Sequence, residues 1–178
     1  MSWLLENVES PVGHILLMHD GERLAALDFE DHEERMRSLA ARYLENTTFV
    51  RTSEPSHFGQ ALQAYFKGDI RAIDNLATMS LGTEFQAKCW AALRKIPPGE
   101  TRSYAQQAVM IGNPKAVRAV GLANGANPIG IVVPCHRVVG ANGSLTGYGG
   151  GIPRKRWLLE HEAKWAAKSF SLKVQESM

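Results

Sequence analysis

Between residues 101 and 128 the chain carries the start and stop signals of two consecutive short helices. Ser103 is followed three residues later by Gln106, the pattern of a capping box, and Gly112 can end the helix that begins there. Asn113-Pro114 can then open a second helix that is expected to run to about residue 123. Two helices joined by a tight turn are the outline of a helix-turn-helix unit, a common DNA-binding motif.

The segments that follow predict a strand, a wing and a last helix. Residues 129–133 (IGIVV) are expected to form a short buried strand, and Val138-Val139 with residues 144–148 a hairpin around Asn142-Gly143. Pro153 can start a final helix, after which residues 166–178 are expected to be a loosely held C-terminal tail. Residues 81–165 are therefore expected to form a mostly helical, winged helix-turn-helix domain.

The first half has the pattern of a small α/β domain. Apolar runs at residues 14–19 and 23–29 flank Asp20-Gly21, which predicts a hairpin and hence a small antiparallel sheet. Residues 31–44 and 57–68 have apolar side chains at helical spacing, which predicts two helices that cover this sheet. We place the boundary of this N-terminal domain, residues 1–80, in the segment without periodicity that precedes residue 83. This half carries no cysteine and no group of reactive residues, so a structural role is expected for it.

Charge divides along the same boundary. Residues 1–80 hold 7 basic and 13 acidic side chains, a net charge of −6, whereas residues 81–178 hold 13 basic and 5 acidic, a net charge of +8. An asymmetry of this size predicts that the second half meets a polyanion while the first half stays away from it. A chance distribution of surface charge is the alternative.

Composition excludes several other classes of protein. No apolar run approaches the roughly 18 residues that cross a bilayer, and the N-terminal residues include acids where a secretory signal would carry lysines, so we expect a cytoplasmic protein without membrane contact. The two cysteines, Cys89 and Cys135, are too few for a disulfide framework and are expected to be free thiols. Cys89 lies on the apolar stripe of a helix predicted over residues 83–96, where a cysteine packs as a small hydrophobic side chain.

Cys135 is the candidate nucleophile. It follows Pro134 at the end of the predicted strand, and His136 and Arg137 place positive charge beside it, which favours the reactive thiolate. His136 could act on the thiol directly or through a water. A buried structural cysteine is the alternative at this point. The zinc deaminase pattern is excluded because Val138 stands where its second cysteine is required, and the sequence has no Walker loop, HExxH or GxGxxG motif.

The second helix of the helix-turn-helix unit is lined with small residues around the single charged Arg118: Ala116, Ala119, Gly121 and Ala123. Proteins that recognise bases in the major groove normally carry long polar side chains on this helix. The pattern therefore favours sequence-neutral or minor-groove docking. Tight packing of the helix on its own domain is the alternative.

Seven motifs in one register resemble the O6-alkylguanine-DNA alkyltransferase family. They are Gly82–Gln86 (GTEFQ), Ser103-Tyr104, Gly112–Gly121 (GNPKAVRAVG), Asn127-Pro128, Pro134–Val138 (PCHRV), Gly147–Gly151 (GYGGG) and Trp157–Glu162 (WLLEHE). The resemblance covers about residues 80–163. Residues 1–80 are similar in size and element order to the RNase H-like N-terminal domain of that family, which is a weaker match.

The resemblance implies a DNA repair activity in which Cys135 takes the alkyl group irreversibly and is consumed, with no cofactor. It implies that His136 and Glu162 form, through a water, the relay that removes the thiol proton, that Asn127 supports the turn of the cysteine, and that Tyr104 donates toward guanine N3. Taken alone, Glu162 would be a solvated helix acid and Tyr104 a half-buried aromatic.

The resemblance also implies how damaged DNA is held. The partner is duplex DNA with O6-alkylguanine, and O4-alkylthymine as a further substrate, bound by a monomer that flips the damaged base. Arg118 fills the gap in the minor groove, on a helix whose Ala116, Ala119 and Gly121 allow close approach. The pocket is formed by main-chain groups of Val138 and Gly149 and by Tyr148.

Two departures from the family pattern bear on the expectations. Gly149 stands where some members have a serine, so we expect a roomier pocket wall and tolerance of bulkier alkyl groups. Residues 1–80 lack the cysteines with which certain members bind zinc, so no metal is expected. Arg154, Lys155 and Arg156 are expected to lie on a solvated face. An alkylguanine-binding sensor without transfer and a thiol hydrolase are the alternative functions.

Overall fold

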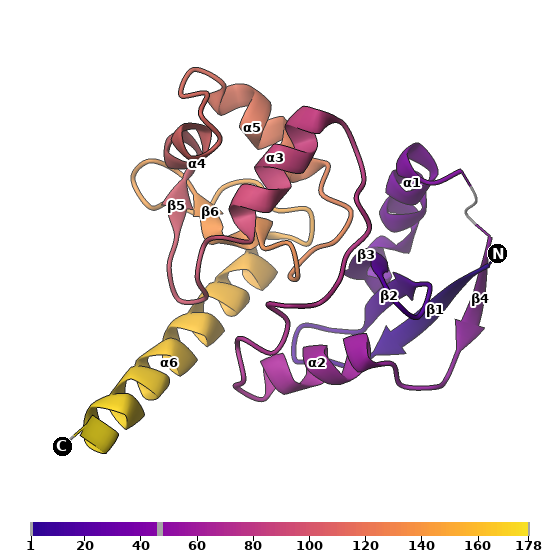
Figure 1. Ribbon diagram of the computed structural model, residues 1–178, viewed down its shortest axis with the longest axis horizontal. Helices are drawn as coiled ribbons and strands as arrows, with labels where there is room; N and C mark the ends of the chain where they lie inside the picture. Colours follow the sequence, from indigo (N-terminus) through magenta and orange to yellow (C-terminus); the bar gives the residue numbers. More distant parts are fainter. Residues whose placement is uncertain (1, 46–47, 178) are drawn as a thin grey trace.

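The N-terminal half is built on a four-stranded sheet. The computed structural model describes residues 2–45 and 48–177, and the side chains up to residue 169. Strands β1 (Trp3–Val8), β2 (Ile15–His19), β3 (Leu24–Phe29) and β4 (Phe49–Thr52) lie in the order β3-β2-β1-β4 (Figure 1). The predicted hairpin is confirmed: β2 and β3 pair antiparallel, and Oδ1 of Asp20 accepts from the main-chain N–H groups of Glu22 and Arg23 in the turn.

The expectation of a purely antiparallel sheet is wrong, because β4 pairs parallel with β1. Between β3 and β4 the chain forms a short 3-10 helix, η1 (Glu30–His32), and helix α1 (Glu33–Tyr43). This helical connection carries the chain across the sheet to its far edge, where the next strand enters in the parallel sense.

Two helices cover this sheet, as predicted, and they lie on its opposite faces. Met36 and Ala40 of α1 belong to the apolar cluster with Leu5, Leu16 and Met18. Helix α2 (His57–Phe66) starts at Ser56, whose hydroxyl accepts from the N–H of Gly59, and packs on the other face. The core on that second face continues into the C-terminal half without a break, so the two halves share one hydrophobic core.

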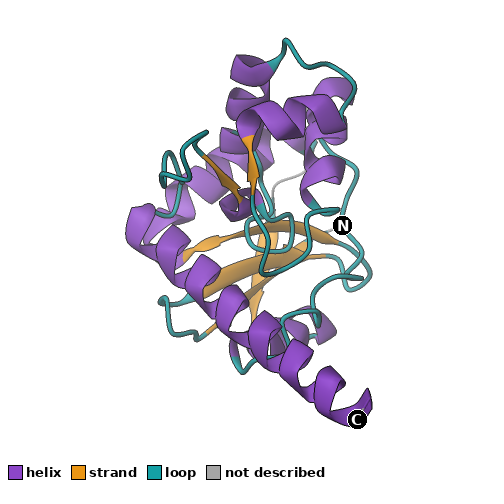
Figure 2. Cartoon of the chain, turned by 90° about the vertical axis from the view of Figure 1, so that its left-hand side faces the viewer, coloured by secondary structure: helices purple, strands orange, loops and turns teal. Residues whose placement is uncertain are grey.

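The C-terminal half is mostly helical, and its position beside the sheet is seen in Figures 1 and 2. It contains α3 (Glu84–Leu93), β5 (Arg102–Ser103), α4 (Tyr104–Met110), α5 (Val117–Gly125), η2 (Cys135–Arg137), β6 (Val138–Val139) and α6 (Ile152–Ser177). The capping box of Ser103 and Gln106 at the start of α4 is confirmed. Two buried side chains, Gln107 of α4 and Asn124 of α5, exchange amide hydrogen bonds of 3.0 and 2.7 Å, which fixes these helices against each other.

Helix α5 begins later than expected. The N–H of Asn113 donates to the carbonyl of Ala108 and the N–H of Gly112 to that of Val109, while Gly112 has φ +76°. These bonds form a Schellman motif that ends α4. Asn113 is therefore part of the end of α4 and does not cap α5, whose N-cap is Ala116.

The predicted strand over residues 129–133 and the predicted wing hairpin are both wrong. Ile131 has φ +66°, and the N–H groups of Val132 and Val133 bond back to Gly130 and Ile129, so this buried segment is a tight double turn. Strand β6 pairs parallel with β5, and residues 144–148 form a loop. An apolar run is equally compatible with a buried strand and with buried turns, since periodicity alone does not separate them.

Residues 166–177, predicted to be a loosely held tail, continue α6, which extends away from the body of the molecule (Figure 1). The proposed boundary near residue 80 falls between α2 and α3 and stays a prediction. None of the helices in the described part of the chain is long and apolar enough to cross a membrane.

Candidate active site

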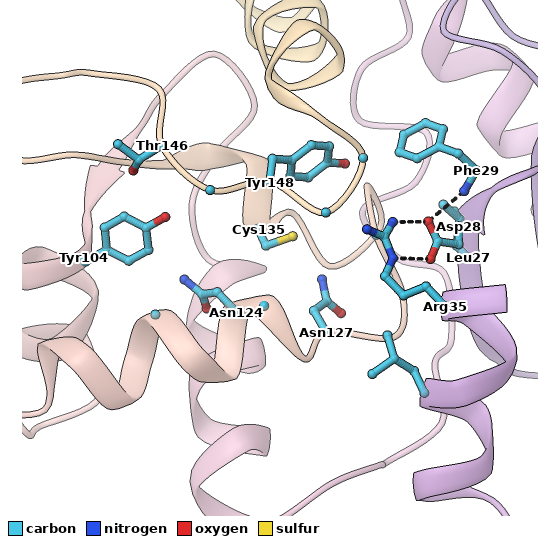
Figure 3. Close-up of a pocket in the computed structure, with 17 residues that line it drawn as sticks. Leu27, Asp28, Phe29, Arg35, Tyr104, Asn124, Asn127, Cys135, Thr146 and Tyr148 are labelled. Atoms are coloured by element: carbon cyan, nitrogen blue, oxygen red, sulfur yellow. Dashed lines mark hydrogen bonds and ion pairs between the residues drawn. The ribbon is translucent and has the colours of Figure 1, made fainter. Parts of the chain in front are cut away.

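Cys135 opens the short helix η2 and faces a cavity of about 490 Å³ (Figure 3). The cavity lies between the two halves of the molecule. Of the residues predicted for the site, it brings together Tyr104, Gly121, Asn127, Cys135, Tyr148 and Gly149. The first half contributes Leu27, Asp28, Phe29, Arg35 and Leu39, so the expectation that this half is only structural is wrong.

Asn127 holds the turn that presents the thiol. Its Nδ2 donates to the carbonyl of Val133 at 2.8 Å, and its Oδ1 accepts from the N–H of Ile129 at 3.0 Å. Burial raises the pKa of the Cys135 thiol, and a hydrogen bond from Asn127 and the charge of Lys155 act in the opposite direction. Asn127 therefore supports the cysteine both through the main chain and through the sulfur.

A fully buried carboxylate bonds to the two residues that follow the cysteine. Glu162 of α6 accepts hydrogen bonds from Nε2 of His136 at 2.8 Å, from Nε and Nη2 of Arg137 at 2.8 and 3.0 Å, and from the hydroxyl of Tyr65 at 2.6 Å. Burial by itself would raise the pKa of Glu162, but His136 and Arg137 hold it well below its ordinary value. Glu162 is thus ionised and saturated with donors, and is not a solvated helix acid.

The bond to Glu162 assigns the tautomer of His136. Because the carboxylate is ionised, Nε2 of His136 carries the proton and Nδ1 is the basic nitrogen. Nδ1 is buried, and no atom of the described residues forms a hydrogen bond with it. His136 and Glu162 are in direct contact, so a bridging water is not needed between them, and Nδ1 is the ring nitrogen left without a bond.

The positive charges near the thiol differ from those expected. Arg137 is buried against Glu162 and donates to the carbonyl of Ile96 at 2.7 Å, so its charge is neutralised away from the sulfur. Lys155, predicted to be solvated, is fully buried and its Nζ donates to the carbonyl of Thr146 at 2.7 Å. Burial lowers the pKa of Lys155, and the neighbouring Cys135 raises it.

The two residues next to Lys155 in the chain, Arg154 and Arg156, have different surroundings. Arg154 bonds across to Asp31 and to the carbonyl of Val12 in the first half, whereas Arg156 is exposed as predicted. The signal that could have revealed Lys155 is its spacing of seven residues, two helical turns, from Glu162, which places both on the buried face of α6.

Gly149 and Gly150, in the wall of the cavity, allow close approach of other side chains. A Cβ on Gly149 would fall on the guanidinium of Arg35, and one on Gly150 would fall on the ring of Phe29. The space beside Gly149 is therefore filled by Arg35, and the expectation of a roomier wall is wrong. Asp28 holds this guanidinium through bonds to Nε and Nη2 at 2.9 and 2.5 Å. No sequence signal linked Arg35 to the site, because the contact depends on how the two halves pack.

The remaining predicted residues do not line the cavity. Val138 is fully buried in β6. Burial raises the pKa of Tyr148, which does line the cavity, well above its ordinary value. On α5, Arg118 and Ala119 are exposed and Ala116 is half-buried. Ala123 is buried, and its carbonyl accepts from the indole N–H of Trp90, so tight packing accounts for this member of the small-residue set. Leu122, which the sequence did not single out, is 72% exposed on the same helix.

Cys89 is buried in α3 as predicted, and burial raises its pKa. Over residues 2–45 and 48–169, no three His, Cys, Asp or Glu side chains form a group that could hold a metal ion.

Comparisons with known proteins cover nearly the whole chain. Residues 5–78 match the ribonuclease-like domain of 6-O-methylguanine DNA methyltransferase, and residues 84–164 match its DNA binding domain. The methylated-DNA–protein-cysteine methyltransferase of Salmonella typhimurium is 46% identical over 162 residues, which are 89% of this chain and 95% of that protein. The protein of the same name from Mycobacterium tuberculosis is 47% identical over 168 residues, covering 93% and 95%.

Solved structures agree in fold. The crystal structure of M. tuberculosis O6-methylguanine methyltransferase matches with a TM-score of 0.72 at 41% identity, covering 91% of this chain and 93% of that one. A crystal structure of M. tuberculosis OGT in complex with DNA matches with the same TM-score at 42% identity, covering 91% and 94%. These matches confirm the resemblance and the two-part α/β architecture expected from the sequence. The chain belongs to the methylated-DNA–protein-cysteine methyltransferase family.

Proposed function

We propose that this protein repairs O6-alkylguanine in duplex DNA by moving the alkyl group to Cys135, once per molecule. The observation that carries the proposal is that the thiol lines a cavity, while the next residue in the chain, His136, is buried and bonded to ionised Glu162. That pair supplies a base for the thiol proton, and family membership supplies the class of substrate.

The transfer is a displacement at saturated carbon. The thiol proton passes to Nδ1 of His136, directly or through a water, and the thiolate sulfur forms a bond to the alkyl carbon while the bond from that carbon to O6 breaks. The electron pair of the broken bond goes to the guanine, which Tyr104 assists by donating its hydroxyl proton toward N3. Because the product thioether has no good leaving group, Cys135 is not regenerated.

The substrate base has to leave the duplex before it reaches the sulfur. An alkyl group on O6 points into the major groove, and extrusion of the base costs a few kcal/mol. We propose that Arg118, exposed on α5, fills the gap from the minor groove and offsets part of that cost, and that Ala116, Ala119 and Gly121 let the helix approach the backbone closely. In the pocket, the carbonyls of Cys135 and Val138 would accept from the exocyclic amine, and the N–H of Gly149 would face O6.

O4-alkylthymine carries the same alkyl-oxygen group on a smaller ring, and we propose it as a slower second substrate. The monomeric state and the cytoplasmic location stay predictions.

Intact mass measurement after incubation with a duplex that carries one O6-methylguanine tests the proposal. We expect a mass increase equal to one methylene, retained in Cys89→Ser and lost in Cys135→Ser. Binding of the duplex by the unchanged protein without any mass increase would indicate a sensor and would overturn the proposal. Turnover of an ester with no adduct would indicate a hydrolase.

A further inference from the structure

One wall of the cavity beside Cys135 is a charged side chain from the other half of the molecule. Arg35 projects from α1 toward the cavity (Figure 3). Its guanidinium occupies the position that a side chain on Gly149 would take. Gly130, on the turn that leads to Cys135, lines the same cavity. Arg35 is therefore the side chain that fills the space beside Gly149 in the cavity wall.

The guanidinium is fixed in orientation and has a free donor. Asp28 accepts from Nε and Nη2, and Asp28 is itself held because Oδ1 accepts from the N–H of Phe29 at 2.8 Å. Within the described part of the chain, no acceptor bonds to Nη1, which is the atom nearest to Gly149. Arg35 thus offers the cavity a charged N–H group that needs no reorganisation before it bonds.

The alkyl group of the substrate would lie next to this donor. In the proposed function the N–H of Gly149 faces O6, so the first carbon on O6 lies between that group and the sulfur of Cys135. Any longer substituent extends from there along the cavity wall, where Arg35 covers Gly149. A terminal carboxylate at this position accepts from Nη1, whereas an apolar terminus of equal size removes water from that donor and gives nothing in return.

We infer that Arg35 is a specificity-determining residue that makes the protein prefer O6-alkyl groups ending in a carboxylate over apolar groups of the same shape. The inference rests on the proposed function and names a substrate class within it. Lys155, a buried cation near Cys135, lies on the side of Thr146 and adds to the positive potential that an anionic substituent meets.

The test compares transfer rates for three duplexes that carry O6-methylguanine, O6-carboxymethylguanine or O6-isobutylguanine. Carboxymethyl and isobutyl have the same branched shape but differ in intrinsic reactivity at the first carbon, so the change in their rate ratio between the unaltered protein and a variant reports the contribution of Arg35. We expect Arg35→Met to lower the carboxymethyl-to-isobutyl rate ratio about tenfold.

Three further variants separate the donor from other effects. Arg37→Met is the matched control, because Arg37 lies on the same helix but is exposed and pairs with Glu33, so it should keep the full preference. Asp28→Asn with Arg35→Met removes the unpaired carboxylate that the single substitution leaves, and should still lack the preference. Arg35→Lys keeps the charge and should retain part of it.

Failure of this inference and failure of the proposed function give different results in this experiment. An unchanged ratio in Arg35→Met and in the double variant, with methyl transfer intact, would overturn the inference and leave the proposed function standing. Absence of transfer from all three duplexes by the unaltered protein would overturn the proposed function and the inference with it.

Discussion

Glu162 shows how one buried charge can be tolerated in this core. Its two oxygens accept from four donors on three side chains, and two of those donors belong to Arg137, which also carries the compensating charge. An unpaired carboxylate at this depth would cost several kcal/mol. The hydrogen bonds therefore stabilise the fold and hold His136 in the tautomer that the proposed reaction needs.

Substitution of Glu162 by Gln should change how stability depends on pH. The folded-state pKa of Glu162 lies below its ordinary value of 4.5, so its stabilising contribution is complete above the unfolded-state pKa and is lost as the pH falls through the folded-state pKa. We expect Glu162→Gln to lower the free energy of unfolding by about 3–5 kcal/mol at pH 7, since Arg137 is left buried without its counter-charge.

Urea unfolding at pH 7 and at a series of values below 4.5 measures this effect. The difference between the two proteins should shrink as the pH falls below 4.5. A difference that is independent of pH would show that the carboxylate charge is not what stabilises the core.

At the level of single residues, the sequence singled out a candidate nucleophile but predicted little of its surroundings. Cys135 and His136 could be proposed from a dipeptide, but the effect of Arg137 could not, because successive side chains of a short helix point in different directions. Glu162 needed the family resemblance, since its burial depends on α2 and α6 packing together. Arg35 had no signal at all, because it lies about 100 residues from the cysteine in sequence.

At the level of elements, most caps and turns with defined chemistry were predicted well, although Asn113 does not cap α5. The hairpin at Asp20-Gly21, the capping box at Ser103 and the end of α4 at Gly112 are all present. The errors concern β4, the segment 129–133 and the wing. In each of these a short apolar run takes its conformation from distant partners, which local sequence does not encode.

The Schellman motif at Gly112 provides a test at the same level. Gly112 has φ +76°, and no atom lies within 4 Å of the position that a Cβ would take there, so Gly112→Ala adds backbone strain and no collision. We expect the free energy of unfolding to fall by about 1 kcal/mol. Gly125→Ala, at the last position of α5 with equally open space and no positive φ, should show no loss. Equal losses in thermal or urea unfolding would contradict this explanation.

At the level of the whole molecule, the first half supports the site of the second. The two halves share a core, Arg35 and Asp28 line the cavity of Cys135, and the hydroxyl of Tyr65 reaches Glu162 from α2. The difference in net charge between the two halves can be counted directly from the sequence. It could not predict this interface, because a net charge of −6 says nothing about which individual side chains face inward.

Removal of the Tyr65 hydroxyl should therefore slow alkyl transfer from a distance. Tyr65→Phe takes one of the four donors from Glu162, and we expect the transfer rate at pH 7 to fall about threefold to tenfold, together with a loss of about 1–3 kcal/mol in stability. Tyr43→Phe is the control, because the hydroxyl of Tyr43 also joins the two halves, at the carbonyl of Ala126, without touching Glu162. A stability loss in Tyr65→Phe with an unchanged transfer rate would limit this residue to a structural role.

Arg118 should matter for the duplex and not for the chemistry. It is exposed on α5 and does not line the cavity of Cys135, so it can act only while the base is being extruded. We expect Arg118→Ala to slow transfer from O6-methylguanine in a duplex about tenfold or more, and transfer from the free modified base by less than about twofold. Arg156→Ala, the removal of an exposed cation on α6, should change both rates little. Because the free base has no stack to leave, equal losses on both substrates after Arg118→Ala would place Arg118 in the pocket reaction and would remove the main argument for a base held outside the helix.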